Sequence, residues 1–284
     1  MDTRYPSQAV TPELREWILA QTQAGCEAGD ILEAMHASGW NDAVARAALA
    51  QMLPPAASTQ GLAGATAPMP EPDLHGAPSL LRLPDRDVQV LLTMQRPRVV
   101  LFGRFMSDDE CDALIALARP RLARSQTVDH RSGGSEVNAA RTSDGMFFER
   151  GEAPLIQRIE QRIAALLRWP VDKGEGLQIL RYRPGAQYRP HFDYFDPSQP
   201  GTAAVLERGG QRVGTLIIYL HVPAQGGGTV FPDVGLEVVP VKGHALFFSY
   251  DCPQESTGTL HGGSPVTDGE KWVATKWLRE RVFG

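Results

Sequence analysis

Residues 177–195 read LQILRYRPGAQYRPHFDYF and combine a short apolar run with a histidine and an aspartate two positions apart. The apolar run, Leu177–Tyr182, predicts a β-strand that ends at a Pro-Gly turn. Residues i and i+2 of an extended segment point to the same side, so the side chains of His191 and Asp193 can converge on one ion. A surface histidine beside a turn aspartate would give the same motif, so further ligands are needed to decide.

A second histidine and a lysine downstream complete a candidate metal site. His261 stands ten residues before Lys271, and the segment Trp272–Leu278 alternates as a strand does. Two histidines and one carboxylate leave three positions of an ion open, which is the arrangement of non-haem Fe(II) oxygenases. A basic side chain is what a dicarboxylate cosubstrate needs there, because its distal carboxylate would otherwise be buried unpaired. Lys271 read alone would be a solvated strand lysine.

Longer stretches around these residues resemble the prolyl 4-hydroxylase family of 2-oxoglutarate oxygenases. The resemblance is carried by residues 177–195, by GGQRVGTLIIYLHV (209–222) and HGGSPVTDGEKWVATKWL (261–278), and upstream by FMSDDECDALIALA (105–118) and RTSDGMFF (141–148). It covers residues 98–284, about two thirds of the chain. It implies an Fe(II) enzyme that consumes 2-oxoglutarate and O₂, with ascorbate as reductant, and releases succinate and CO₂ as peptidyl proline is hydroxylated.

The resemblance also implies a role for individual residues. The iron ligands, which form the catalytic centre, would be His191, Asp193 and His261, and Lys271 would pair with the 5-carboxylate of 2-oxoglutarate. The residues expected to bind the cosubstrate beside Lys271 are Tyr182, Tyr219 and Thr275. The residues expected to form the peptide groove are Tyr188, Arg212 and Trp277. For each of these last six residues, the alternative is a position in the core or on the surface with no functional role.

One position departs from the family pattern. Relatives usually read Gly-Gly-Glu-Thr where this chain reads Gly226-Gly227-Gly228-Thr229. Gly228 is not a ligand position, so we expect metal binding to persist, but the shape and polarity of the nearby rim are put in doubt. Two other segments, residues 125–140 and 196–208, are polar or glycine-containing and are expected to be mobile loops, the second of them over the site.

Helical patterns precede strand patterns in this part of the chain. A capped, acidic helix start at Ser107–Glu110 and an amphipathic stretch at residues 155–167 come before most of the short strand-like segments, which Gly and Pro separate. This order predicts an α+β fold, in which helices back a double-stranded β-helix (jelly roll) core.

The region before residue 81 has a different composition. Residues 1–53 are expected to form a small all-α module, because residues 12–53 show three short helical patterns. The run AMHASGWNDAVARAAL (34–49) resembles the three-helix ubiquitin-associated (UBA-like) fold. A module that docks a partner or dimerises is one reading, and a mere appendage is the other. Residues 54–80, rich in Pro, Ala and Gly, predict a linker before an oxygenase domain at residues 81–284.

Composition excludes several other classes of protein. The net charge is −5 with a pI near 5.8, and no long run of like charge occurs, so no nucleic-acid partner is expected. Three cysteines, Cys26, Cys111 and Cys252, form no CxxC pair and read as free thiols. No signal-peptide pattern and no apolar stretch of ~18 residues is present, so no membrane span is expected and a cytoplasmic location is the default.

Three functions are compatible with the sequence. The first is hydroxylation of proline in a protein or peptide partner. The second is hydroxylation of a free amino acid or another small molecule by the same iron site, in a groove closed at its ends. The third is a catalytically silent binding module that engages a partner through residues 12–53. The intact set His191, Asp193, His261 and Lys271 counts against the third.

Overall fold

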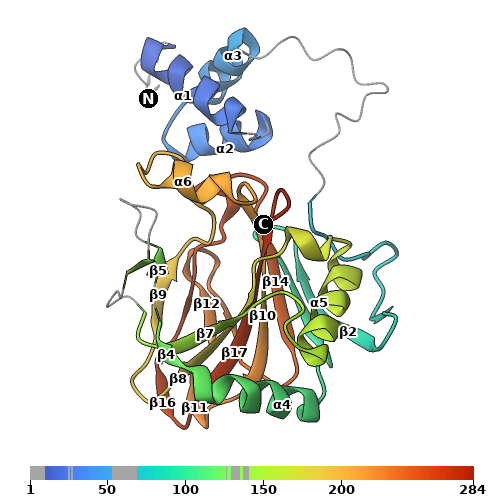
Figure 1. The fold of residues 1–284 in the computed structure, drawn as a ribbon. Coiled ribbons are helices and arrows are strands. Elements are labelled where there is room, and N and C mark those ends of the chain that lie inside the picture. Colours follow the sequence, from blue (N-terminus) through green and yellow to red (C-terminus); the bar gives the residue numbers. More distant parts are fainter. Residues whose placement is uncertain are drawn as a thin grey trace. The chain divides into compact units, whose positions relative to one another are not determined.

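The structure, a computed structural model, describes residues 10–24, 26, 28–52, 69–125, 127–128, 135–136 and 141–284. It divides the chain into two units, Met1–Pro68 and Met69–Gly284 (Figure 1). Among the described residues, no helix combines the length and the apolar character needed to cross a bilayer.

The first unit contains three short helices, α1 (Pro12–Gln23), α2 (Ala28–Ala37) and α3 (Asp42–Met52). Thr11 caps α1, because its side chain accepts a hydrogen bond from the backbone N–H of Leu14 at 3.2 Å. The buried apolar residues between the helices include Ile18, Ile31, Met35, Ala45 and Ala48. The predicted N-terminal module, its likeness to the UBA-like fold and its docking role stay predictions.

The second unit is built on a nine-stranded antiparallel sheet, the major sheet. Its strands in spatial order are β1 (Leu80–Arg82), β2 (Asp87–Met94), β3 (Arg98–Gly103), β14 (Ala245–Ser249), β10 (Arg212–His221), β17 (Lys271–Arg279), β8 (Leu177–Tyr182), β7 (Asp144–Phe148) and β4 (Ala123–Arg124).

A four-stranded sheet, the minor sheet, lies against one face of the major sheet. Its strands in spatial order are β13 (Leu236–Val238), β12 (Thr229–Phe231), β15 (His261–Gly263) and β9 (Tyr188–His191). Apolar side chains of both sheets form one buried cluster, with Leu246 and Val273 from the major sheet and Phe231 and Val238 from the minor sheet. Two sheets that share a core in this way form the predicted jelly roll.

The described part of this unit also contains two short strand pairs and four short 3₁₀ turns. The pairs are β11 (Gln225–Gly226) with β16 (Val266–Asp268), and β5 (Thr127–Val128) with β6 (Ser135–Glu136). The 3₁₀ turns are η1 (Arg119–Arg121), η2 (Val171–Lys173), η3 (Pro232–Val234) and η4 (Glu255–Thr257).

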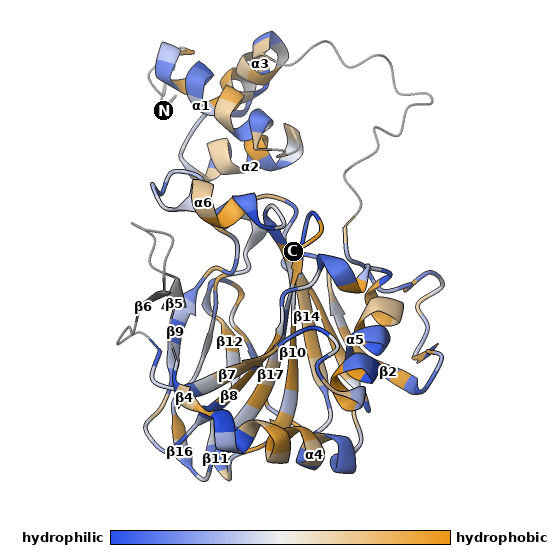
Figure 2. Cartoon of the chain, viewed as in Figure 1, coloured by the Kyte–Doolittle hydropathy of each residue, from blue (hydrophilic) through white to orange (hydrophobic). Residues whose placement is uncertain are grey.

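Two helices, α4 (Asp108–Ala118) and α5 (Pro154–Leu167), cover the opposite face of the major sheet (Figure 1). Ser107 and Glu110 form the predicted capping box at the start of α4. Figure 2 shows hydrophobic residues gathered along β14, β10 and β17. Since side chains alternate along a strand, β17 sends Trp272, Ala274 and Leu278 into the core under the helices. Lys276 lies on the same face and pairs with Glu160 of α5, whereas Val273 packs into the cluster shared with the minor sheet.

The predicted linker, residues 54–80, extends too far, because residues 69–80 make contacts with the rest of the second unit. The backbone N–H of Glu71 donates to the carbonyl of Leu167 at 2.9 Å, and the Glu71 carboxylate pairs with Arg98. Met69 and Leu74 pack against the main core. The Pro-rich composition of this segment gave no indication of these apolar and charged contacts. The rest of the predicted linker, residues 54–68, lies outside the described residues.

The structure corrects one of the two predicted loops and describes only part of the other. Residues 196–208 contain a helix, α6 (Thr202–Glu207), and the Thr202 hydroxyl donates to the Asp196 carbonyl at 2.6 Å. The stretch TAAVLE favours a helix, but the Pro and Gly residues that flank it led to the prediction of a loop. Within residues 125–140, Ser125 is buried and bonded to the Ser143 hydroxyl at 2.9 Å, and β5 and β6 are described. The remaining positions of that loop lie outside the described residues.

A buried ion pair joins β17 to α5. The Lys276 ammonium donates to Glu160 at 2.5 Å, and each side chain is 2 % exposed. The other oxygen of Glu160 accepts from the backbone N–H of Gly151 at 2.9 Å. Removing one partner would leave the other charge uncompensated in the core.

We expect Glu160→Ala to lower the free energy of unfolding by about 3–5 kcal/mol, because it leaves Lys276 buried without a counter-ion. The double variant Glu160→Leu/Lys276→Met should recover most of that loss, since no charge remains buried. Urea denaturation of the whole chain measures both. As a control, Asp112→Ala breaks an exposed pair with Lys242 (2.7 Å) and should cost less than about 1 kcal/mol. A Glu160→Ala protein as stable as this control would contradict the prediction.

Candidate metal centre

Two histidines meet because β9 and β15 are neighbours. His191 and His261 are cross-strand partners, and their ring centroids lie 4.4 Å apart. The Nδ1 atom of His191 lies 2.9 Å from the carbonyl oxygen of Arg189, and Nδ1 of His261 lies 2.9 Å from that of Thr259. A carbonyl only accepts, so each Nδ1 carries the proton. Each Nε2 therefore keeps its lone pair for a metal.

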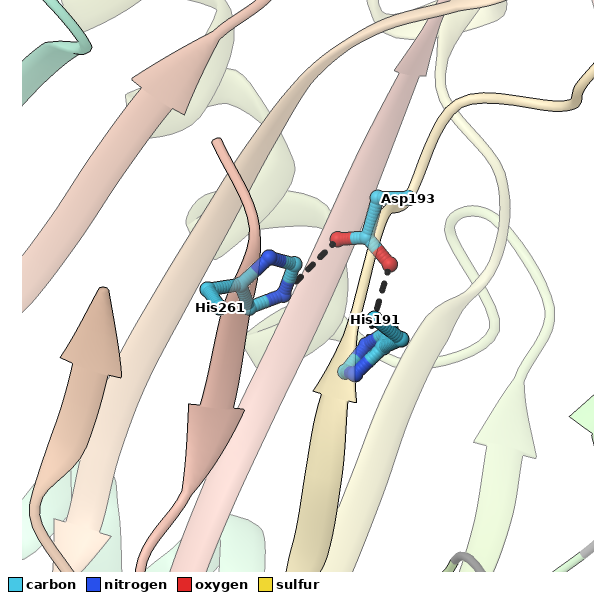
Figure 3. A group of neighbouring side chains, drawn as sticks. All are labelled: His191, Asp193 and His261. Atoms are coloured by element: carbon cyan, nitrogen blue, oxygen red, sulfur yellow. Dashed lines mark ion pairs between the residues drawn. The ribbon is translucent and has the colours of Figure 1, made fainter. Parts of the chain in front are cut away.

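Asp193 places its carboxylate between the two rings (Figure 3). One oxygen, Oδ1, lies 3.5 Å from Nε2 of His191, and the other, Oδ2, lies 3.5 Å from Nε2 of His261. Ligand atoms of all three residues fall within 4.8 Å of one another. The predicted convergence is present, although Asp193 lies in a bend just beyond the end of β9 and the segment does not stay extended.

The environment sets Asp193 and His261 in the ionisation states that a metal requires. Burial raises the pKa of the Asp193 carboxyl, but His261, His191 and Arg212 outweigh it and hold that pKa well below its usual range. Burial is also the main cause that lowers the pKa of His261 to about 4, so this imidazole is neutral at pH 7. Imidazole nitrogens from two histidines and one carboxylate on one side of an ion fit Fe(II).

A small cavity of about 50 Å³ adjoins the three ligands and contains a buried cation. The ammonium of Lys271, which is 4 % exposed, lies 5.7 Å from the ring centroids of both Tyr182 and Tyr219. Burial lowers the pKa of Lys271 to about 8. No carboxylate among the described residues forms an ion pair with it. A buried ammonium without a counter-ion marks this cavity as a site for an anion.

The residues predicted around Lys271 divide into lining and supporting positions. Tyr182 and Thr275 line the small cavity. The ring of Tyr219 lies as close to the Lys271 ammonium as the ring of Tyr182 does, and its hydroxyl lies 2.9 Å from the hydroxyl of Thr229, which lines the cavity. Tyr219 thus supports the wall from the core.

A larger cavity of about 480 Å³ also adjoins His191 and Asp193. Its wall contains the three residues predicted for the groove, Tyr188, Arg212 and Trp277. Arg212 pairs with both oxygens of Glu175, at 2.7 and 3.0 Å, and its guanidinium carbon lies 4.0 Å from the ring centroid of Trp277. The indole N–H of Trp277 is buried and has no hydrogen-bond partner among the described residues.

Comparison with known proteins places this site in a family. The model of the 2OG-Fe(II) oxygenase superfamily matches residues 177–279, the part of the chain that holds every residue predicted for the site. Prolyl 4-hydroxylase 2 of Arabidopsis thaliana is 37 % identical over 234 residues, which cover 74 % of this chain and 75 % of the relative. The chain belongs to the prolyl 4-hydroxylase family. It is a 2-oxoglutarate-dependent dioxygenase, of a superfamily that uses Fe(II), 2-oxoglutarate and O₂.

Two further relatives each cover about two thirds of this chain. Prolyl 4-hydroxylase 1 of Arabidopsis thaliana is 42 % identical over 203 residues, or 66 % of this chain and 70 % of the relative. Among solved structures, the viral collagen prolyl hydroxylase of Paramecium Bursaria Chlorella virus-1 aligns with a TM-score of 0.49 and 30 % identity, covering 64 % of this chain and 95 % of that chain.

Sequence reasoning missed Arg141, which lines both cavities of this dioxygenase. Its guanidinium donates to the Gln178 amide oxygen at 2.7 Å and to the Ser143 hydroxyl at 3.3 Å, and lies 5.0 Å from the ring centroid of Tyr188. Arg141 opens the stretch RTSDGMFF, which supported the resemblance, but its contacts depend on a strand far along the chain. Glu175 was missed as well, because no motif surrounds it.

The departure at Gly228 has a structural counterpart on the neighbouring strand. A Cβ atom built at Gly228 would lie 2.1 Å from a carboxylate oxygen of Glu237, which is on β13. Glu237 therefore occupies the space that a side chain at position 228 would take. The rim in this dioxygenase keeps a carboxylate, but the carboxylate comes from the opposite strand.

We expect His261→Ala to weaken the binding of Mn(II), used as a stable stand-in for Fe(II), by more than the about 10- to 100-fold typical of changes beyond the ligands themselves. Equilibrium titration followed by electron paramagnetic resonance of free Mn(II) measures the affinity. His221→Ala, at the exposed end of β10, is the matched control and should bind like wild type. Equal Mn(II) affinity in the two variants would remove His261 from the ligand set.

Proposed function

We propose that this enzyme hydroxylates proline within a peptide or protein, with Fe(II) held by His191, Asp193 and His261 and 2-oxoglutarate anchored by Lys271. The observation that carries the proposal is the buried, unpaired ammonium of Lys271 in the cavity that the three metal ligands also line. The names of the relatives support proline as the target.

Lys271 suits the distal carboxylate of 2-oxoglutarate for electrostatic reasons. A buried ammonium without a counter-ion is costly, and a bound carboxylate would remove that cost while satisfying its own need for a partner. Tyr182 and Thr275 line the same cavity and can contribute hydroxyl hydrogen bonds. The cosubstrate would then reach from Lys271 to the metal ligands, which line the same cavity.

The larger cavity favours a peptide over a free amino acid. Among the described residues that line it, Asp193 and Glu175 are the only carboxylates. Asp193 belongs to the metal site, and Glu175 already pairs with Arg212 and with Arg279 at 2.8 Å. No carboxylate is left to pair with the ammonium group of a free amino acid. A residue inside a peptide carries no such charge.

The wall of the larger cavity also suits a proline-rich chain. It contains a set of aromatic rings, which are Phe147, Tyr188, Phe192, Tyr194, Phe195 and Trp277. Aromatic walls bind proline rings and extended proline-rich segments well. Phe147 is 47 % exposed, so the wall continues to the surface, as a passing chain requires. The unpaired indole N–H of Trp277 is a donor for a carbonyl of the bound chain.

The chain's own residues place the reactants and keep water out. When bound, iron with 2-oxoglutarate and O₂ supplies the oxidant for C–H hydroxylation, with succinate and CO₂ as products. Lys271 fixes the cosubstrate at one end, and the two histidines and Asp193 fix the metal. Tyr188 and Trp277 line both cavities, so the same rings can hold the target residue against the metal site.

We expect the affinity for 2-oxoglutarate to fall above pH 8. The pKa of Lys271 is lowered to about 8 by burial, so at higher pH a proton must be taken up before the ammonium can bind the cosubstrate's carboxylate. The dissociation constant of the Mn(II)-loaded protein should stay level below pH 8 and rise by up to about tenfold per pH unit above it. Calorimetric titration without O₂ measures it.

Lys271→Arg and Lys271→Met are the controls for this pH dependence. An arginine keeps its charge throughout the range, so its affinity should be level with pH. A methionine should bind weakly at every pH. The same decline above pH 8 in Lys271→Arg would show that another group titrates and that Lys271 is not the anchor.

Succinate formation tests the proposed substrate class. We expect proline-rich peptides to stimulate Fe(II)-dependent succinate formation, because a substrate in the larger cavity completes the site. The matched peptides with alanine in place of proline should not, and His191→Ala should form none with either. Stimulation by free proline but not by any peptide would instead support a small-molecule hydroxylase. No His191-dependent succinate with any substrate, from protein shown to bind metal, would support the silent binding module.

A further inference from the structure

The Asp193 carboxylate is held differently from the two histidines. His191 and His261 lie in paired strands, and backbone carbonyls fix their rings. Asp193 lies in the bend after β9, outside the sheet ladder. Its orientation therefore has to come from side chains of other elements.

Thr215 on β10 supplies such a contact. Its hydroxyl lies 2.7 Å from Oδ2 of Asp193. The same hydroxyl lies 3.0 Å from the hydroxyl of Tyr250, which directly follows β14. All three side chains are buried, Thr215 and Tyr250 almost completely. The three groups form one chain of hydrogen bonds from β14 through β10 to the metal ligand.

The direction of both hydrogen bonds follows from the chemistry of the groups. An ionised carboxylate can only accept, so Thr215 must donate its single proton to Asp193. The Thr215 oxygen can then only accept from its other neighbour, so Tyr250 must be the donor. Burial, with the nearby charge of Asp193, raises the pKa of Tyr250 well above its usual value, which keeps its hydroxyl protonated.

We propose that Thr215 and Tyr250 are positioning residues that fix the Asp193 carboxylate in the orientation that the metal requires. The proposal rests on the metal site proposed above, but not on the identity of the substrate. Neither hydroxyl touches the metal's other ligands, and neither lines the cavities. Arg212 adds a weaker restraint, because its Nη1 lies 3.4 Å from the backbone carbonyl of Asp193.

The test compares Mn(II) affinities of the full-length protein without cosubstrate. Thr215→Val keeps the shape and removes the hydroxyl, so the dissociation constant should rise about 10- to 100-fold. Thr215→Ser keeps the hydroxyl and should bind like wild type. Tyr250→Phe should bind more weakly than wild type, but less so than Thr215→Val. The double variant Thr215→Val/Tyr250→Phe should be no weaker than Thr215→Val, because both residues act through one bond.

Thr202→Val is the matched control. It removes another buried threonine hydroxyl, which donates to the carbonyl of Asp196 at 2.6 Å, and Thr202 lines neither cavity. Its Mn(II) affinity should equal that of wild type. The absorption spectrum of bound Co(II), which reports ligand geometry, should change in Thr215→Val and not in Thr202→Val.

Three results would overturn the proposal. Equal Mn(II) affinity in Thr215→Val and wild type would show that Asp193 keeps its orientation without the hydroxyl. An equal loss in Thr202→Val would show a general effect of removing buried hydroxyls. Wild-type protein that binds no Mn(II) would overturn the metal site itself. If thermal melts show that Thr215→Val does not fold, Tyr250→Phe carries the test, and an unchanged affinity there would sever the link between Tyr250 and the metal.

Discussion

Alternation of side chains along β17 is the constraint on which both the core and the site depend. Trp272, Ala274 and Leu278 fill the core under α4 and α5, while Lys271, Thr275 and Trp277 face the cavities. A slip of one residue would exchange every one of these side chains between the two faces. It would also move Lys276 away from Glu160 and place Lys271 among apolar side chains. Packing and buried charge therefore fix the same register. The packing of the core thus also fixes the positions of the side chains that line the site.

The two cavities share a wall but differ in charge. The walls of both contain Arg141, Tyr188, His191, Asp193 and Trp277. The small cavity holds an ammonium without a described counter-ion, whereas in the larger one Glu175 is already paired. An anion and an uncharged chain segment would thus occupy different cavities that both adjoin the metal site. Their reacting ends would meet at the shared wall, where the histidine and aspartate lie.

The sequence predicted the parts of the site that depend on local spacing, and failed where contacts depend on chain bends or distant partners. The spacing of His191 and Asp193 and the alternation of β17 are local, and the structure brings these residues together with His261 and Lys271. The hydrogen bond between Tyr219 and Thr229 of the minor sheet had no signal in the sequence, because it joins strands of two different sheets. Thr215 could not be foreseen as a partner of Asp193. The bend after β9 that brings them within 2.7 Å has no signal in an HxD motif. The contacts of residues 69–80 were missed because a Pro-rich composition says nothing of a distant surface.

The space shared by Gly228 and Glu237 has a consequence for how this rim can evolve. A glutamate introduced at position 228 would require the exposed Glu237 side chain to turn away, since a Cβ atom at 228 would lie 2.1 Å from its carboxylate oxygen. Shortening Glu237 first would leave an intermediate with no carboxylate at this place. The effect of either substitution therefore depends on the residue at the other position, and the two are expected to covary among relatives.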